Sequence, residues 1–191
     1  MRQGEKMGAR HPDKREQRIN RQTDYERVRS ALRAGAHHGC YVFDALMTDE
    51  AGLLDYLVVG PYGISAVIVR SEHGDVQPDS QTGELTIIRS PFEDDPRRQA
   101  NDLLEDVARK LERQDIPIFF LICFTRAEIK DSGDPEADRG LYQTWGLPKI
   151  FEDREEVLEP EDVDELARSI ESIYARPPFV RPGEPYGGQT I

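Results

Sequence analysis

The stretch DYLVVGPYGISAVIVR (Asp55–Arg70) predicts two strands joined by a tight turn. Its apolar runs are rich in valine and isoleucine, which favour strands, and the GPYG between them has the residues of a tight connection. A further strand-like run, CYVFDALM, precedes it and ends in the turn TDEAG. Short strands joined by short turns predict an antiparallel meander. The run ISAVIVR is nearly all apolar, so we expect both of its faces to be covered.

Helical patterns surround this meander. TDYE predicts a helix that starts at Thr23, with Glu26 closing a capping box. A second helix starts at Asp95, and a third covers residues 160–175. The remaining apolar runs predict strands: a central one at PIFFLICF, an edge-like continuation of the meander at ELTIIR, and a short one at LPKIF. This order predicts an α/β (α+β) fold in which helices flank a layered mixed β-sheet.

Length and charge limit the organisation and the partners. The 191 residues fit one domain, which we place at 23–175, between a charged, flexible tail (1–22) and a Pro/Gly-rich, disordered tail (176–191). No run is long and apolar enough for a membrane span or a signal peptide, which predicts a cytoplasmic protein without a membrane partner. The net charge of −12 argues against a general nucleic-acid coat protein but leaves a local basic groove open.

Asp55 is the first candidate for chemistry. By strand alternation it shares a face with Leu53, Leu57 and Val59, and a carboxylate on an apolar face must be paired, hydrogen-bonded or bound to a cation. The simpler interpretation is a structural carboxylate at the rim of the sheet. On the next strand Arg70 shares a face with Ile68, and that face continues to Glu72 if the strand extends.

The stretch DYLVVGPYGISAVIVR, followed by SEHGDV, resembles the core of the nuclease-related domain (NERD) family, a relative of the restriction-endonuclease-like nucleases. The family pattern is an Asp opening a strand, V-V-x-P-x-G, a strand ending in Glu-x-Lys, and a later Gly. Asp55 matches the Asp, Pro61 and Gly63 match the turn, and Gly74 matches the later Gly. The resemblance covers about residues 23–125 and implies a restriction-endonuclease-like sheet.

The resemblance extends to two more positions and fails at two. Gln99, at the end of SPFEDDPRRQ, and Glu26 stand where the family has a Gln and a first-helix Glu. Ile68 and Arg70, however, stand where the family has its Glu and Lys. In such nucleases the Asp and Glu hold a divalent cation that activates water. With Ile68, one metal-ligating carboxylate remains, so we expect no cofactor, and Mg²⁺ or Mn²⁺ only if the protein is active.

A rearranged site is the alternative. Asp55 and Glu72, with or without Glu26, would make a weak metal site, although carboxylates in turns and first helical turns need no functional explanation. Arg97 and Arg98 lie beside Gln99 near a helix N-terminus, where anions bind readily. We rank other residues lower: His37-His38 at a helix end, His73 as a solvated turn residue, Trp145 as a packing residue, and Cys40 and Cys123 as buried thiols.

Three functions follow from this pattern. The first is a catalytically degenerate nuclease-related domain, a pseudoenzyme whose site remnant (Asp55, Arg70, Gln99) lies in a cleft for nucleic acid or a protein partner. The second is an active, metal-dependent nuclease with rearranged carboxylates. The third is a structural, protein-interaction domain, which the acidic charge favours. We expect the first, and the sequence indicates no oligomeric state.

Overall fold

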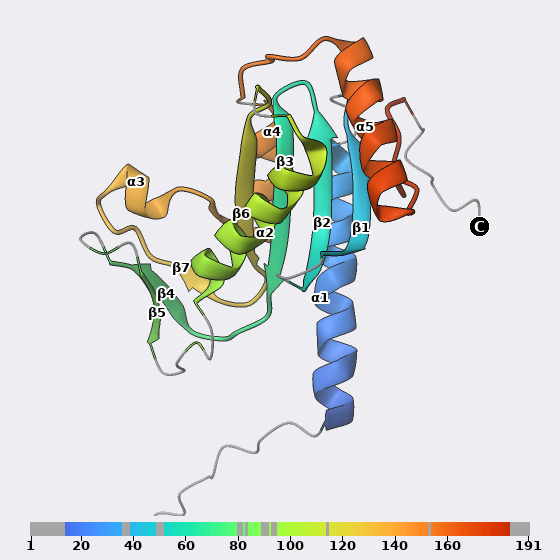
Figure 1. Ribbon diagram of the computed structural model, residues 1–191. Coiled ribbons are helices and arrows are strands. Elements are labelled where there is room, and N and C mark those ends of the chain that lie inside the picture. The colour runs from blue at the N-terminus through green and yellow to red at the C-terminus, as the bar shows by residue number, and fades with distance from the viewer. Residues whose placement is uncertain are drawn as a thin grey trace, which may run out of the picture.

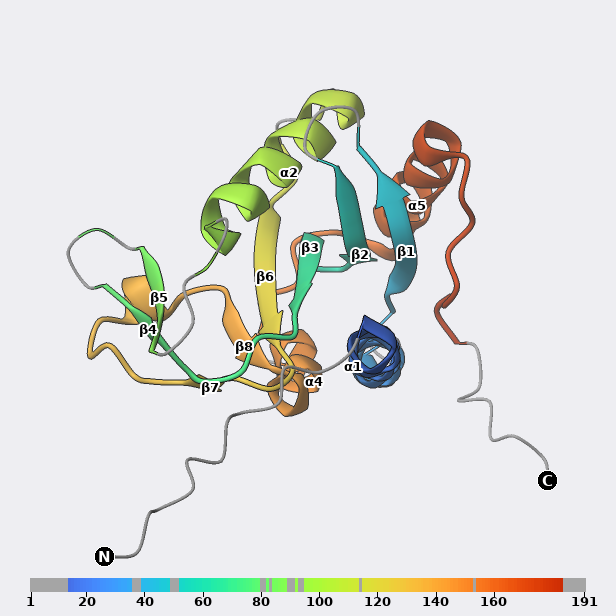
Figure 2. The same cartoon turned by 90° about the horizontal axis from the view of Figure 1, so that it is seen from below.

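Five strands form a mixed sheet in the order β1-β2-β3-β6-β8, with helices on both faces (Figure 1, Figure 2). The computed structural model describes residues 14–35, 39–48, 52–79, 82, 84–88, 92, 95–113, 115–152 and 154–183. The five strands are β1 (Tyr41–Met47), β2 (Leu53–Gly60), β3 (Gly63–Arg70), β6 (Ile118–Phe124) and β8 (Leu141–Gln143). The predicted mixed sheet flanked by helices is therefore confirmed.

The antiparallel meander at the start of this sheet is also confirmed. β1 pairs with β2, and β2 turns back at Gly60↔Gly63 to pair with β3. At Gly63 φ is +108°, and a Cβ added there would lie 2.3 Å from the carbonyl oxygen of Pro117, so a glycine is needed. The crossover through α2 (Pro96–Leu111) then brings β6 parallel to β3, and β8 adds parallel to β6.

The helices divide the apolar residues into two layers. Helices α2 and α5 (Pro160–Tyr174) cover one face of the sheet, and α1 (Lys14–Gly35) and α4 (Leu147–Glu152) cover the other (Figure 2). Leu57 and Ile68 belong to the core under α2 and α5, while Val58 and Val67 belong to the core under α1 and α4. β3 is thus covered on both faces, as its apolar sequence predicts.

Three sequence predictions about elements are wrong. Helix α1 begins at Lys14 and runs through Thr23, so Thr23 does not cap it. LPKIF forms the helix α4 rather than a strand, because a short apolar run fits either element and packing decides. ELTIIR does not extend the meander: β4 (Asp75–Pro78), β5 (Leu85–Ile88) and β7 (Glu128–Ile129) form a separate sheet beside the main one (Figure 1).

The chain ends lie partly outside the described residues. Residues 1–13 and 184–191, together with His37 and His38, belong to that part. Residues 176–183, which we predicted as the start of a disordered tail, lie against β1, where the amide of Phe179 donates to the carbonyl of Val42 at 2.8 Å. Among the helices described, none is long and apolar enough to cross a membrane.

We expect Glu112→Gly to stabilise the protein by about 1 kcal/mol, because Glu112 ends α2 in the left-handed conformation, at φ 53°, where glycine carries no Cβ penalty. The midpoint of urea denaturation reports the change. The same substitution at exposed Glu105, inside α2, is the control and should cost about 1 kcal/mol. Loss of stability in Glu112→Gly would contradict this account of the helix end.

Candidate functional site

Three parallel strands end side by side and define the candidate site. Arg70 at the end of β3 pairs in register with Phe124 of β6, which pairs with Gln143 of β8. Ligands in open α/β sheets bind outside the carboxyl ends of parallel strands. Polar residues follow two of these ends: Glu72 and His73 after β3, and Arg126 after β6. We call the following residues the carboxyl-end cluster: Arg70, Glu72, His73 and Arg126, together with Asp55 and with Asp24, Tyr25 and Gln99 from α1 and α2.

Asp55 lies where the β2–β3 ladder opens. The last paired residues are Tyr56 and Val67, and beyond them the amide of Val69 donates to Asp55 Oδ2 at 2.8 Å. The hydroxyl of Tyr25, on α1, donates to Oδ1 at 2.5 Å. Asp55 is only 8% exposed, so these bonds replace water. Both carboxylate oxygens therefore accept hydrogen bonds from the fold itself.

The prediction that Asp55 shares a face with Leu57 is wrong. Leu57 packs under α2 and α5 together with Leu54, whereas Asp55 contacts Tyr25 of α1 on the opposite face. Leu54 and Leu57 are three positions apart, and such residues face opposite sides of a regular strand. The alternation of β2 therefore breaks between them. The neighbouring strand is irregular at the same level, with Ala45 at φ 50° between the pairs that flank it. This distortion turns Asp55 toward α1.

Arg70, Glu72 and Gln99 lie together, whereas the sequence grouped Arg70 and Gln99 with Asp55 and considered Glu72 as a metal partner of Asp55. Nη2 of Arg70 lies 2.5 Å from Oε1 of Glu72, and Nη1 donates to the side-chain carbonyl of Gln99 at 3.4 Å. The guanidinium also lies over the ring of Phe92, 5.3 Å from its centroid. Among the described residues, Nε of Arg70 and Oε2 of Glu72 are buried without a hydrogen-bond partner. The strongest contact of this group is thus an ion pair within the chain.

The other predicted residues lie elsewhere. Glu26 is exposed on α1, and Arg98 is exposed on α2. Arg97 donates to the carbonyl of Ala137 in α3 (Pro135–Asp138), and burial lowers the pKa of its guanidinium. Arg97 therefore connects α2 to α3.

Sequence reasoning missed the most buried carboxylate of the cluster. Asp24 of α1 is fully buried, and its Oδ2 accepts a hydrogen bond from Nε of Arg126 at 2.7 Å. Nη1 of Arg126 donates to Nε2 of His73 at 3.2 Å, so His73 belongs to the cluster and is not only a solvated turn residue. The spacing of Asp24 to buried Val28, four residues, is one helical turn and marks Asp24 as facing inward. That signal was available in the sequence.

The two guanidinium groups of the cluster are each paired with a carboxylate. Arg70 lies against Glu72 and Arg126 against Asp24, so the positive charge at this end of the sheet is largely compensated locally. In the described part of the chain, no three His, Cys, Asp or Glu side chains are placed to hold a metal ion together.

The two cysteines are buried thiols, as predicted. Burial raises the pKa of Cys40 to about 11 and that of Cys123 to about 12. Since the thiolate is the nucleophile, neither side chain is an activated nucleophile at neutral pH.

Comparison with known proteins adds no relative: none of the family models, curated proteins or solved structures matches this chain.

Proposed function

We propose that this chain is a nuclease-related domain with a restriction-endonuclease-like fold whose hydrolytic centre is disabled. On this proposal the carboxyl-end cluster serves binding and structure and not cleavage. The order of elements supports it: the stretch that carries the resemblance to the NERD family has a helix, three antiparallel strands, a crossover through β4, β5 and the helix α2, and a parallel strand.

The state of Asp55 is the observation that carries this proposal. A metal-ligating carboxylate needs oxygen lone pairs directed at the ion. Each oxygen of Asp55 already accepts one hydrogen bond, from Tyr25 or from the amide of Val69, so fewer lone pairs are left for an ion. The second metal-ligand position of the family corresponds to Ile68, which is 3% exposed in the core under α2 and α5. These residues do not fit the divalent cation that the family resemblance implies.

The rearranged nuclease has less support. Glu72 would have to leave its ion pair with Arg70 to join Asp55 at a cation, and Glu26 points to solvent from α1. Arginine cannot take over as a general base, because it stays protonated. We therefore infer no hydrolytic step at this cluster.

A protein-interaction domain without a nucleic-acid role is the second candidate. The observation in its favour is that Arg70 and Arg126 are paired within the chain, in a protein of net charge −12. Affinity for nucleic acid comes largely from cations that neutralise phosphates. A guanidinium that is already paired with a carboxylate attracts phosphate only weakly. At the carboxyl-end cluster itself, a protein partner is thus at least as well supported as nucleic acid.

A nicking assay tests the proposal. We expect no cleavage of supercoiled plasmid or single-stranded DNA by the purified protein with Mg²⁺ or Mn²⁺, and no difference between the native chain and Asp55→Ala. The control is Arg168→Gln, an exposed α5 residue outside the cluster, prepared in parallel to show whether an unrelated substitution changes any cleavage. Metal-dependent cleavage that Asp55→Ala abolishes and Arg168→Gln retains would overturn the proposal in favour of the rearranged nuclease.

A further inference from the structure

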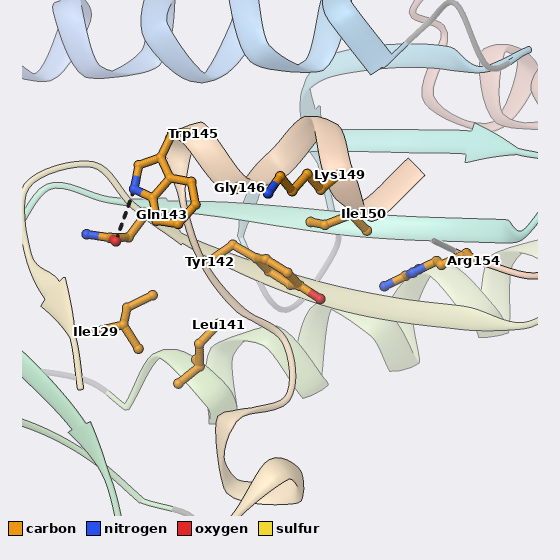
Figure 3. Close-up of a pocket in the computed structure, with 9 residues that line it drawn as sticks. All are labelled: Ile129, Leu141, Tyr142, Gln143, Trp145, Gly146, Lys149, Ile150 and Arg154. Carbon is orange, nitrogen blue, oxygen red and sulfur yellow. Dashed lines mark hydrogen bonds between the residues drawn. The ribbon is translucent and has the colours of Figure 1, made fainter. Parts of the chain in front are cut away.

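Trp145 is 73% exposed, although we predicted a packing residue; that prediction is wrong. It lies in the short helix η2 (Thr144–Gly146), which follows β8 directly and presents the indole at the surface. The indole N–H donates to Oε1 of Gln143 at 3.1 Å, which orients the ring (Figure 3). Tryptophan is rarely left so exposed on an ordinary surface, because its large apolar ring gains most from burial. An oriented and exposed indole indicates a binding surface.

A groove runs from Trp145 along the edge strand β8. Its first part is a pocket of ≈ 410 Å³, in which the ring of Tyr142 lies between Trp145 at one end and Arg154 at the other (Figure 3). A second pocket of ≈ 680 Å³ beside the start of β6 shares Tyr142 and Arg154 with the first. The two pockets therefore join into one surface, which we call the β8 groove.

The charges in this groove oppose those of the whole chain. Of the nine described residues that line the first pocket, Lys149 and Arg154 are charged, and both are cations. The second pocket adds Arg139, whose charge is compensated by Glu136, and one carboxylate, Glu155. A cationic groove on a chain of net charge −12 is suited to an anionic ligand, because its field acts locally at short range.

Arg154 is held in place before any ligand binds. Its Nη1 donates to the hydroxyl of Ser65 at 3.1 Å, and its guanidinium lies over the ring of Phe119, 4.2 Å from the centroid. A fixed cation loses less conformational entropy on binding than a free side chain does. The groove thus holds an oriented indole, a tyrosine ring and one positioned cation, Arg154, together with Lys149.

We propose that the β8 groove binds a single strand of nucleic acid. Sequence-tolerant binding of single strands uses aromatic side chains on which bases stack and cations that follow the phosphates. Trp145 and Tyr142 supply the rings, and Lys149 and Arg154 supply the cations. In a duplex the bases are already stacked on one another, so their faces cannot reach Trp145. The inference goes beyond the proposed function and does not depend on it, because none of these four residues belongs to the carboxyl-end cluster.

Trp145 is the only tryptophan of the chain, so its fluorescence reports on the groove directly. We expect a homopolymeric single strand of about ten nucleotides to quench it saturably in EDTA, where no metal-dependent cleavage occurs. The matching duplex and an equal concentration of mononucleotides should quench it at least about tenfold more weakly. Two phosphate contacts predict a slope of about −1.4 for log affinity against log salt.

Variants identify the side chains. Trp145→Ala should weaken binding of a labelled strand, followed by its anisotropy, by about tenfold, and Trp145→Phe should weaken it less. Lys149→Gln should reduce the salt slope by about 0.7, whereas Arg168→Gln, the same change of charge on exposed α5, should leave slope and affinity unchanged. Circular dichroism confirms that each variant is folded.

Several results would overturn the inference. These are the absence of quenching and of anisotropy change, equal binding of duplex or mononucleotide, or equal effects of Lys149→Gln and Arg168→Gln. Quenching by an acidic peptide but not by the strand would also overturn it and would assign the groove to a protein partner. Nuclease activity would overturn the proposed function but not this inference. Binding is measured in EDTA, where a metal-dependent nuclease does not cleave the strand.

Discussion

Arg126→Met is expected to lower the free energy of unfolding by about 3–5 kcal/mol, the largest effect that we anticipate for a single substitution. The reason is the fully buried carboxylate of Asp24, whose Oδ2 lies 2.7 Å from Nε of Arg126. The other cation near Asp24 is Arg27, with Nη1 at 3.8 Å and a side chain that is 61% exposed, so it compensates the charge only weakly. Removing Arg126 leaves a buried charge without its main partner.

Urea denaturation followed by circular dichroism measures this loss. Fluorescence is less suitable, because Trp145 is already 73% exposed in the folded protein. Arg139→Met is the matched control: Arg139 pairs with Glu136, but the two side chains are 72% and 76% exposed, so we expect a change below about 0.5 kcal/mol.

The double variant Asp24→Asn/Arg126→Met separates charge from shape. It leaves no ionised group at this position, so we expect it to recover about half of the loss. A loss in Arg126→Met no larger than that in Arg139→Met would contradict the view that this ion pair holds α1 to the end of β6.

Asp55→Ala is expected to lower the free energy of unfolding by about 3 kcal/mol, because two donors lose their acceptor. These are the hydroxyl of Tyr25 at 2.5 Å and the amide of Val69 at 2.8 Å. The amide is the more costly of the two, since it lies in the part of β3 where the ladder to β2 has ended. Chemical denaturation reports the change.

Asp55→Asn should cost less than Asp55→Ala, about 1–2 kcal/mol, because its one carbonyl oxygen can still accept one of the two hydrogen bonds. Asp44→Ala on β1 is the control, a half-buried carboxylate of the same sheet that pairs with Arg176 and Arg29. It should cost less than Asp55→Ala, because both arginines keep contact with solvent. A stable Asp55→Ala variant would show that the carboxylate is not structural. It would then remove the main support for a disabled hydrolytic centre.

Much of the central fold could be predicted because the pattern of apolar residues is local. The apolar runs of β1 to β3, the turn GPYG and the apolar stripe of α2 are properties of neighbouring residues, and the structure has these elements where they were expected. LPKIF is too short for its period to distinguish helix from strand, and packing against α1 decides for a helix. The sequence of ELTIIR likewise did not predict that β5 pairs with β4 in a separate sheet, because strand pairing depends on distant chain segments such as β7.

The candidate site was predictable only in part, for the same reason. Arg70 and Gln99 were both named as candidates and lie together, but the ion pair of Arg70 with Glu72 was not expected. Asp24 and Arg126 are 102 residues apart, so no local pattern joins them. The direction of Asp55 also escaped prediction, because the break in strand alternation at Ala45 and Asp55 is a feature of two paired strands and not of either sequence alone.

By itself, then, the stretch Asp55–Arg70 determined a strand, a tight turn and a buried strand. Only the tertiary structure decided what Asp55 does, by bringing Tyr25 and the amide of Val69 to its two oxygens. Only the tertiary structure left Trp145 at the surface beside Lys149 and Arg154. Periodicity is set by adjacent residues, whereas hydrogen bonding and exposure are set by whatever the rest of the chain packs against them.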